Sequence, residues 1–273
     1  MKTKFLLATL LTFSAFGFVA CGDDNDDNDS TTTEQTDGSS SQSDGQSSDN
    51  GTAQGGTETD GNIANSEDAK YFALDKTFSS TATYYGGGYT GGCCMLDDFC
   101  QNYYVAALNE YDYKEGLMAG AYLEVTGPNG TIDVLITDLM PYSGNESNCT
   151  VGAIDLNEKA FEKIANKVDG KVNISWKVKA LPTDSPVKFK FKEGSSQYWC
   201  GIQVQNHRYP LKKLEVKQNG QYIELPKKYY NYFLAESGLG EGPYDIRLTD
   251  IYGHVIEETN IPLNQTTVGK HNF

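Results

Sequence analysis

Apolar and polar residues alternate along much of the chain after residue 77. Ile132, Val134 and Ile136 share one face of an extended segment, and stretch 172–178 repeats the pattern with Val, Ile, Trp and Val at every second position. A period of two places successive side chains on opposite faces of a strand, so one face enters a core. Region 77–178 is therefore predicted to be mostly β, and its short strands favour a barrel.

One helical pattern interrupts these strands. Ala160, Phe161 and Ile164 form an apolar stripe, and Asn157 before them is suited to cap a helix N-terminus. We expect a single short helix here.

A second β region follows the proline-containing stretch 181–186. Val187, Phe189 and Phe191 alternate with lysines, and Asn219-Gly220 between apolar pairs predicts a type I′ hairpin. About 90 residues of short strands at this spacing favour a β-sandwich. The expected division is a barrel over 69–181 and a sandwich over 182–273.

The N-terminus has the pattern of an export signal. Lys2 and Lys4 precede the apolar run 5–18, which is too short to span a bilayer comfortably. The run ends in FVAC at 18–21, which resembles a bacterial lipobox in which Cys21 is acylated. The prediction for 1–21 is a lipoprotein signal, a membrane anchor and a cell-surface location. The alternative is a secretory signal cut nearby, with Cys21 incidental and the protein released.

Charge is distributed unevenly along the chain. Of the net −15, stretch 22–68 contributes 13 acidic residues and no Lys or Arg, in a background of Ser, Asp, Gly and Thr. Such a composition buries too little surface to offset the entropy of ordering, so a disordered linker is predicted. Residues 69–273 carry 24 acidic against 20 basic residues, which argues against nucleic-acid binding. We expect a monomer.

Five cysteines remain after residue 21, namely Cys93, Cys94, Cys100, Cys149 and Cys200. Export favours disulfides, and the odd count leaves one thiol over. A metal site is the weaker interpretation because no His lies near this cluster. No metal and no cofactor are predicted.

The segment 198–205 carries the most informative aromatic residue. Alternation puts Cys200, Ile202 and Val204 in the core and Trp199 on the other face with two glutamines. A flat ring on a polar face suits the C–H face of a sugar. The alternative is that Trp199 is ordinary sandwich core. Tyr198 would join Trp199 only through a bulge.

Asp138 and Asp155 each lie near the end of an apolar segment. Such residues often cap turns or face solvent. If both face one cleft, they would bind sugar hydroxyls, and one would be suited to act as a general acid.

Region 77–273 resembles the bacterial expansins. The matching stretches are ATYYG at 82–86, GYTGG at 88–92, AYLEV at 121–125, TDL at 137–139, IDL at 154–156, KEGSS at 192–196, IQVQNH at 202–207 and YN at 230–231. The resemblance implies an all-β chain in which a double-psi β-barrel precedes an immunoglobulin-like sandwich, the latter a carbohydrate-binding module.

The resemblance also implies site residues. It places a polysaccharide groove on the barrel, with Asp155 as the acid that activity requires: Thr83, Tyr84, Asp138, Met140 and Asp155. Met140 stands where the family has an aromatic residue, and Tyr142 is a possible substitute. It places a cellulose platform on the sandwich: Tyr198, Trp199, Tyr230 and the adjacent Lys192. The cysteines at 93, 94, 100 and 149 are additional to the family pattern, and two disulfides are expected among them, with Cys200 free and buried.

The implied function is non-hydrolytic loosening of cellulose, xylan or another wall polysaccharide. Inverting endoglucanases on a similar barrel need a base opposite the acid, and no carboxylate stands at the Thr83 end of the groove. One enzymatic alternative is a lytic transglycosylase that uses Asp155 as its acid, with peptidoglycan as partner. Another alternative is a surface adhesin that only binds carbohydrate.

Overall fold

The computed structural model describes residues 63–273, so the predicted signal peptide, Cys21 and most of the predicted linker lie outside the described residues. Folded structure begins ahead of the predicted linker end at residue 68. Ile63 is fully buried, and helix α2 (Glu67–Tyr71) is capped by Ser66, whose hydroxyl accepts a hydrogen bond from the Ala69 amide. In the described part of the chain, no helix is long and apolar enough to cross a membrane.

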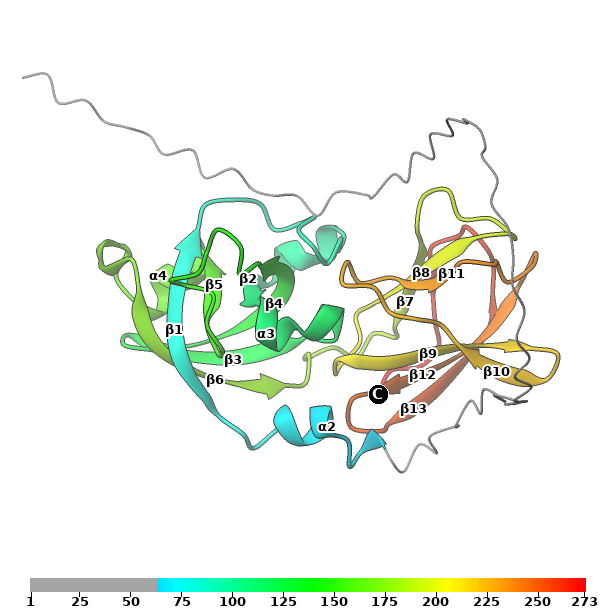
Figure 1. Ribbon diagram of the computed structural model, residues 1–273, viewed down its shortest axis with the longest axis horizontal. Helices are drawn as coiled ribbons and strands as arrows, with labels where there is room; N and C mark the ends of the chain where they lie inside the picture. The colour runs from blue at the N-terminus through cyan, green and yellow to red at the C-terminus, as the bar shows by residue number, and fades with distance from the viewer. Residues whose placement is uncertain (1–62) are drawn as a thin grey trace, which may run out of the picture. The chain divides into compact units, whose positions relative to one another are not determined.

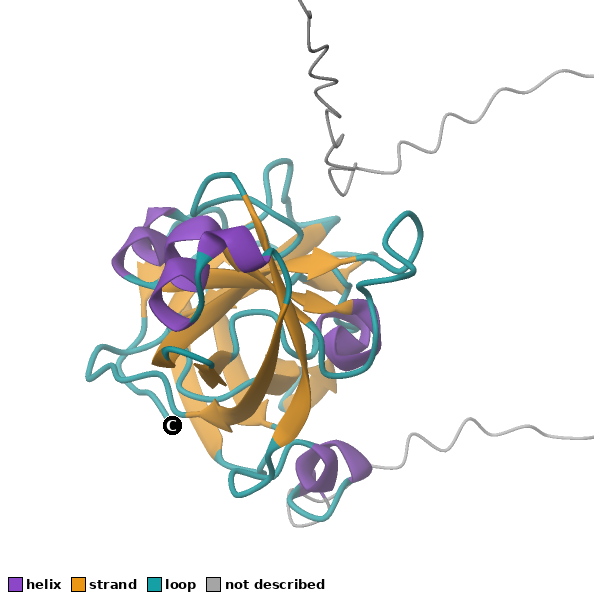
Figure 2. Ribbon diagram, turned by 90° about the vertical axis from the view of Figure 1, so that its left-hand side faces the viewer, coloured by secondary structure: helices purple, strands orange, loops and turns teal. Residues whose placement is uncertain are grey.

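Six strands close into a barrel with the order β1-β5-β2-β4-β3-β6 (Figure 1). β1 pairs with β5 and β2 pairs with β4 in parallel, whereas the other barrel pairs are antiparallel. The strands curve around a common interior (Figure 2), and the predicted double-psi barrel is confirmed. The strand bounds are β1 (Phe78–Tyr85), β2 (Tyr104–Asn109), β3 (Tyr122–Gly127), β4 (Gly130–Met140), β5 (Ile154–Asn157) and β6 (Val172–Lys179).

The barrel core follows the alternation in the sequence. Every second residue of β6 is buried, and Trp176 stacks on Phe78 with ring centroids 4.0 Å apart. The predicted helix is α4 (Glu158–Ile164), whose first turn is capped by the Asn157 side chain. Short segments that the pattern did not predict are α3 (Glu110–Tyr113), η1 (Asp98–Asn102), η2 (Lys114–Gly116) and η3 (Lys167–Asp169).

Two four-stranded sheets form the sandwich, in the orders β10-β9-β12-β13 and β11-β8-β7-β14. Phe189, Ile202 and Val204 are buried between them. Asn219 and Gly220 have φ values of 50° and 83° at the β9–β10 turn, so the predicted hairpin is confirmed. The strand bounds are β7 (Lys188–Phe191), β8 (Cys200–Gln205), β9 (Leu211–Gln218), β10 (Gln221–Glu224), β11 (Phe233–Ala235), β12 (Tyr244–Asp250), β13 (Val255–Ile261) and β14 (Thr267–Val268).

The cysteines bear on one prediction. No disulfide joins any two cysteines within residues 63–273, so the expected pair of disulfides is not seen there. The sulfur atoms lie in different surroundings: Cys94 Sγ is 3.2 Å from the Tyr113 hydroxyl, whereas Cys149 Sγ donates to the Met140 carbonyl at 3.3 Å in a separate small cluster. Cys200 is a buried thiol in the sandwich core, as predicted.

Candidate functional site

Strand register brings the predicted groove residues to one level of the outer barrel surface. Thr83 of β1 is opposite Asp155 of β5, Asp155 is opposite Ala107 of β2, and Ala107 is opposite Asp138 of β4. The row spans four neighbouring strands, and the small Ala107 side chain on β2 lies between the two carboxylates on β5 and β4. Thr83, Asp138 and Asp155 are gathered as the resemblance implied.

Asp155 is held by a short hydrogen bond. The Thr83 hydroxyl donates to Asp155 Oδ1 at 2.6 Å. Burial raises the pKa of Asp155 to about 6; the Thr83 hydrogen bond opposes this rise, and the negative charge of Asp138 adds to it. Asp155 thus keeps its proton to a higher pH than an exposed carboxyl group.

Asp138 is fixed by the loop that follows β1. Its Oδ1 accepts hydrogen bonds from the Cys93 amide at 2.6 Å and the Leu139 amide at 2.8 Å. Burial nevertheless raises the pKa of Asp138 against these two bonds. Gly92 has φ 55°, and a Cβ there would lie 2.8 Å from Asp138 Cγ. The loop glycine therefore permits the close approach of this backbone to Asp138.

Tyr85, not Tyr84, faces the carboxylates. The Tyr84 ring is half-buried and packs beside Phe161 against the barrel core, and its place in the groove stays a prediction. Alternation along β1 places Tyr85 on the same face as Thr83. Burial, with the charges of Asp138 and Asp155, raises the Tyr85 pKa, so its hydroxyl stays protonated near both acids. The sequence analysis missed Tyr85, and its spacing of two from Thr83 is the signal that could have identified it.

Met140 does not offer a surface to a ligand. It is only 5% exposed and packs with Ala107, Cys149 and Ala153, so its prediction as a groove residue is wrong. Two residues further on, Tyr142 is 45% exposed, and its ring lies 6.0 Å from that of Tyr111, which is 50% exposed. The Tyr142 amide donates to Glu110 Oε2 at 2.7 Å, which fixes this aromatic pair at the end of β4.

The predicted sandwich aromatics lie on a turn rather than a bulged strand. Ser196 and Trp199 form an antiparallel bridge, and Gln197 and Tyr198 make the turn between them. Tyr198 is therefore 75% exposed, with Trp199 partly exposed beside it. Strict strand alternation, which would place Tyr198 and Trp199 on opposite faces, therefore does not apply to Tyr198.

Tyr230 lies just before β11, the strand that pairs with β8. Lys192 Nζ is 5.9 Å from the centroid of its ring, so these two predicted platform residues are neighbours. The preceding carbonyl, of Tyr229, accepts a hydrogen bond from the Tyr113 hydroxyl at 2.8 Å. The segment that carries Tyr230 is thereby tied to the barrel.

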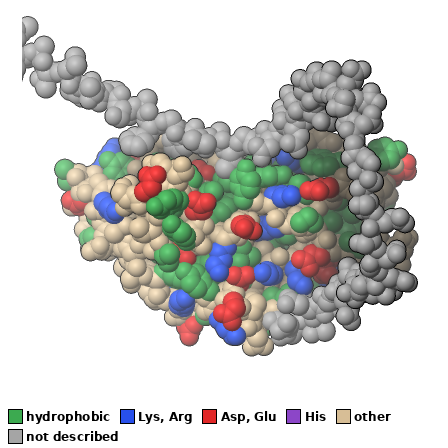
Figure 3. All heavy atoms as spheres, viewed as in Figure 1, with side chains coloured by type: hydrophobic (Ala, Val, Ile, Leu, Met, Phe, Trp, Pro, Cys, Tyr) green, Lys and Arg blue, Asp and Glu red, His purple; other side chains and the backbone are tan. Residues whose placement is uncertain are grey.

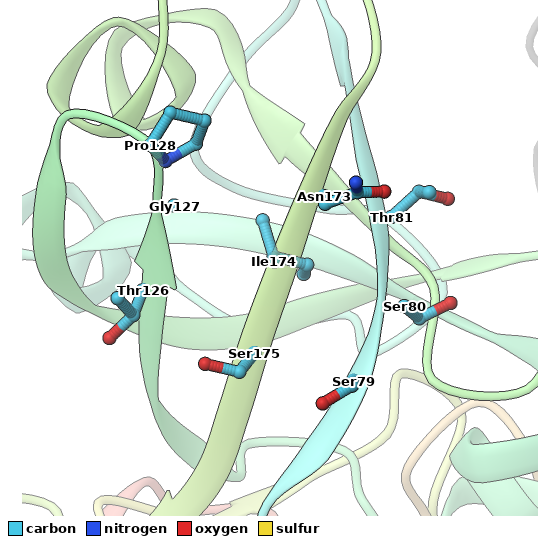
Figure 4. Close-up of a pocket in the computed structure, with 9 residues that line it drawn as sticks. All are labelled: Ser79, Ser80, Thr81, Thr126, Gly127, Pro128, Asn173, Ile174 and Ser175. Atoms are coloured by element: carbon cyan, nitrogen blue, oxygen red, sulfur yellow. The ribbon is translucent and has the colours of Figure 1, made fainter.

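Another hollow on the barrel has a different character. A concavity of about 630 Å³ lies over β1, β3 and β6 (Figure 4). Its nine lining residues include serines, threonines and Asn173 but no aromatic or charged side chain. Acidic and basic side chains are interspersed on the face in Figure 3, in line with the nearly balanced charge of residues 69–273. Within the described residues, no group of three or more His, Cys, Asp or Glu could hold a metal ion.

Comparison with known proteins decides the family. The chain is 40% identical over 202 residues to Expansin-YoaJ of Bacillus subtilis (strain 168), covering 72% of this chain and 84% of that protein. The chain belongs to the expansin family. Expansin-like protein 1 of Dictyostelium discoideum is 26% identical to the present chain over 194 residues, covering 68% of this chain and 67% of the Dictyostelium protein. No family model matches the chain.

Solved expansin structures share the fold. The crystal structure of a mutant Clavibacter michiganensis expansin in complex with cellohexaose has a TM-score of 0.65 and 26% identity, covering 72% of this chain and 98% of that chain. The apo structure of the Clavibacter expansin has the same TM-score at 27% identity.

Proposed function

We propose that this expansin binds cellulose and related wall polysaccharides and loosens the noncovalent contacts between their chains without cutting them. The observation that carries the proposal is the partner of Asp155, the acid with the raised pKa: it is the hydroxyl of Thr83 and not a carboxylate base. Strand register aligns these two residues with Ala107 and Asp138 in one row. The Clavibacter expansin complex with cellohexaose supports cellulose as a ligand.

The groove is suited to grip rather than to hydrolyse. Inverting hydrolysis requires a carboxylate base that activates water opposite the acid. One oxygen of Asp138 accepts hydrogen bonds from two backbone amides, so the carboxylate is committed to holding the loop and β4 together. Asp97, on the loop near this site, is paired with Lys188 at 3.0 Å and with Lys190 at 2.5 Å. The acids and Tyr85 would instead exchange hydrogen bonds with sugar hydroxyls.

Exposed rings would supply the stacking surface. Tyr198, Trp199 and Tyr230 form the proposed platform on the sandwich, with Lys192 beside it. On the barrel, Tyr142 with Tyr111 would take the role that buried Met140 cannot fill, which supports the substitution considered from the sequence.

The proposal is tested by separating binding, loosening and cleavage. The protein should weaken cellulose paper without releasing reducing sugar; Asp155→Asn should abolish weakening yet keep binding. Trp199→Ala combined with Tyr230→Ala should abolish cellulose pull-down, whereas Tyr222→Ala, on β10 of the sandwich, should not. Pull-down that survives the double change would refute the platform, and binding without paper weakening would favour an adhesin.

One observation favours an enzymatic alternative. A carboxyl group with a pKa raised to about 6 by burial is typical of a general acid. A lytic transglycosylase would need only that acid, and Asp138 would be the available base for hydrolysis. Release of reducing sugar from cellulose or xylan, or of anhydro-muropeptides from peptidoglycan, that disappears in Asp155→Asn would establish this alternative.

We further propose that the protein is exported and anchored through an acylated Cys21, with secretion as the alternative. The lipobox-like FVAC sequence at 18–21 supports this. Mass spectrometry of the mature N-terminus should find a lipid-modified Cys21; an unmodified N-terminus at another residue would show that the protein is released.

A further inference from the structure

A second hollow on the barrel is lined by four tyrosines. It has a volume of about 580 Å³ and lies between the loop after β1 and strands β2, β3 and β4. Tyr89 and Tyr103 come from the loop, Tyr104 opens β2 and Tyr122 opens β3. We propose that this tyrosine pocket is a second carbohydrate site, which binds an uncharged stretch of pyranose chain.

The pocket is distinct from the groove. Asp133 lines the pocket, and Asp138 lies in the groove on the same strand, β4. Five residues of extended strand separate them, which corresponds to roughly 17 Å. A sugar ring in one site therefore leaves the other site accessible.

Two of the rings are supports and two are available for contact. Tyr122 is only 7% exposed, and its ring meets that of Tyr103 edge to face at 5.8 Å; Phe99 supports Tyr103 from 6.2 Å. Tyr89 and Tyr104 are partly exposed. Both pack against the barrel core, so their rings lose less side-chain entropy than free rings would when a sugar packs on them.

Polar atoms accompany the rings. Burial, together with the charge of Asp133, raises the pKa of Tyr122 to about 12, so its hydroxyl remains a donor at neutral pH. The Asn102 amide donates to the Phe99 carbonyl at 3.2 Å, which fixes Asn102 with its own carbonyl oxygen as an acceptor. Rings with a few fixed polar groups are the usual lining of small-ligand sites.

Charge at the rim selects neutral sugars. Asp133 is bound by Lys179 at 2.9 Å, and Glu124 is bound by Lys177 at 2.9 Å. These two carboxylates and two ammonium groups cancel, so the Asp133 side of the pocket has no excess positive charge; on the other side, the Lys159 ammonium lies 5.5 Å from the centroid of the Tyr89 ring.

Comparison with the concavity over β1, β3 and β6 indicates that the tyrosine pocket is more than an irregularity of the protein surface. The concavity over β1, β3 and β6 is about as large, yet no aromatic side chain lines it, and Pro128 and Ile174 are the apolar side chains among its hydroxyl and amide groups. Rings that merely covered the core would fill the adjacent space, because protein interiors are close-packed. Here about 580 Å³ stays open beside them.

If the protein loosens polysaccharides as proposed, a second site would let it hold two chain segments at once. This consequence rests on the proposed function. With one chain in the groove and on the platform, the tyrosine pocket would hold a neighbouring chain or a side branch. The saccharide site itself does not depend on loosening activity.

The test isolates the pocket in the full chain carrying Trp199→Ala and Tyr230→Ala. Isothermal titration with cellohexaose and with a xyloglucan heptasaccharide should show binding to at least one of them. Addition of Tyr104→Ala should weaken that binding about tenfold, and Tyr104→Phe should keep it within about twofold because the ring remains. Tyr222→Ala, on β10 of the sandwich, is the matched control and should not change the affinity.

Three results would overturn the proposal: no binding of either neutral sugar, unchanged affinity in Tyr104→Ala, or equally tight binding of trigalacturonate. If Tyr104→Ala unfolds, Tyr89→Ala on the loop replaces it with the same expected loss. Failure of the proposed function would be seen separately, as cellulose paper that does not weaken while this titration still succeeds.

Discussion

At the scale of single residues, the proton on Asp155 is the main chemical feature of the groove. An exposed aspartate titrates near 3.8, whereas burial, opposed by Thr83 and reinforced by Asp138, raises the Asp155 pKa to about 6. A raised folded-state pKa means that the fold favours the protonated acid. Stability from this group is fully present below pH 3.8 and is lost as the pH rises through 6.

Asp155→Asn should therefore be more stable than the wild type at neutral pH. The shift corresponds to at most about 3 kcal/mol, and partial exposure reduces the expected gain to about 1–2 kcal/mol. Urea unfolding at pH 4, 5, 6 and 7 should show the two proteins diverging as the pH rises. Parallel stability curves would contradict the raised pKa.

The sequence predicted individual groove residues better than their contacts. Thr83 and Asp155 followed from the resemblance, but their hydrogen bond joins residues 72 positions apart through the parallel β1/β5 pair. No local pattern contains such a crossover. The resemblance named Tyr84, whereas alternation from Thr83 indicates Tyr85; a difference of one residue inverts the face of a strand residue.

At the scale of elements, the outer face of β8 shows how packing overrides polarity. Gln203 and Gln205 were expected on a polar face, and both are fully buried. Gln203 Nε2 donates to the Cys94 carbonyl at 3.0 Å, and its Oε1 accepts from Gln205 Nε2 at 2.6 Å. A polar residue facing another folded unit has the same sequence pattern as one facing water.

Gln203→Ala should consequently destabilise the protein by about 2 kcal/mol, because it leaves a buried amide of Gln205 without its acceptor. Gln221→Ala, on the exposed strand β10, is the matched control and should change the free energy of unfolding by less than about 0.5 kcal/mol. Urea unfolding of both variants measures the difference. Equal effects would show that the buried amide network contributes nothing specific.

Turns were predicted only where the sequence contains residue types that are typical of turns, such as Asn-Gly. Asn219-Gly220 carries the positive φ values that a type I′ turn requires, so the hairpin was evident. The turn at Gln197 and Tyr198 contains neither Gly nor Pro. Its position depends instead on the Ser196–Trp199 bridge and on Gly238, where a Cβ would lie 2.5 Å from Tyr198 Cα.

At the scale of the whole described chain, the segment before β1 connects the barrel and the sandwich. Asp68 accepts hydrogen bonds from Lys114 of the barrel at 3.0 Å and from Lys212 of β9 at 2.8 Å. The Phe72 carbonyl accepts from the Tyr252 hydroxyl at 2.8 Å, next to β12. The composition of 22–68 obscured this role, because Ile63 and Asp68 stand at the end of a polar run.

Removing the Asp68 charge should test this connection. Burial would raise the pKa of Asp68, but the hydrogen bonds from Lys212 and Lys114 outweigh it and lower the pKa below 3.8. The stabilisation is therefore present above pH 3.8 and lost as the pH falls through the lower folded value. Asp68→Asn should cost about 1–2 kcal/mol at pH 7, measured by urea unfolding, and progressively less at acid pH.

The neighbouring acid provides the control for that experiment. Glu67 is 95% exposed, with its closest ammonium group 3.6 Å away on Lys70. Glu67→Gln should leave the free energy of unfolding within about 0.5 kcal/mol of the wild type, because exposed pairs contribute little. If Asp68→Asn also unfolds in two transitions while Glu67→Gln keeps one, then Asp68 couples the barrel to the sandwich. Equal, small effects of both substitutions would mean that the two β units are held together without this segment.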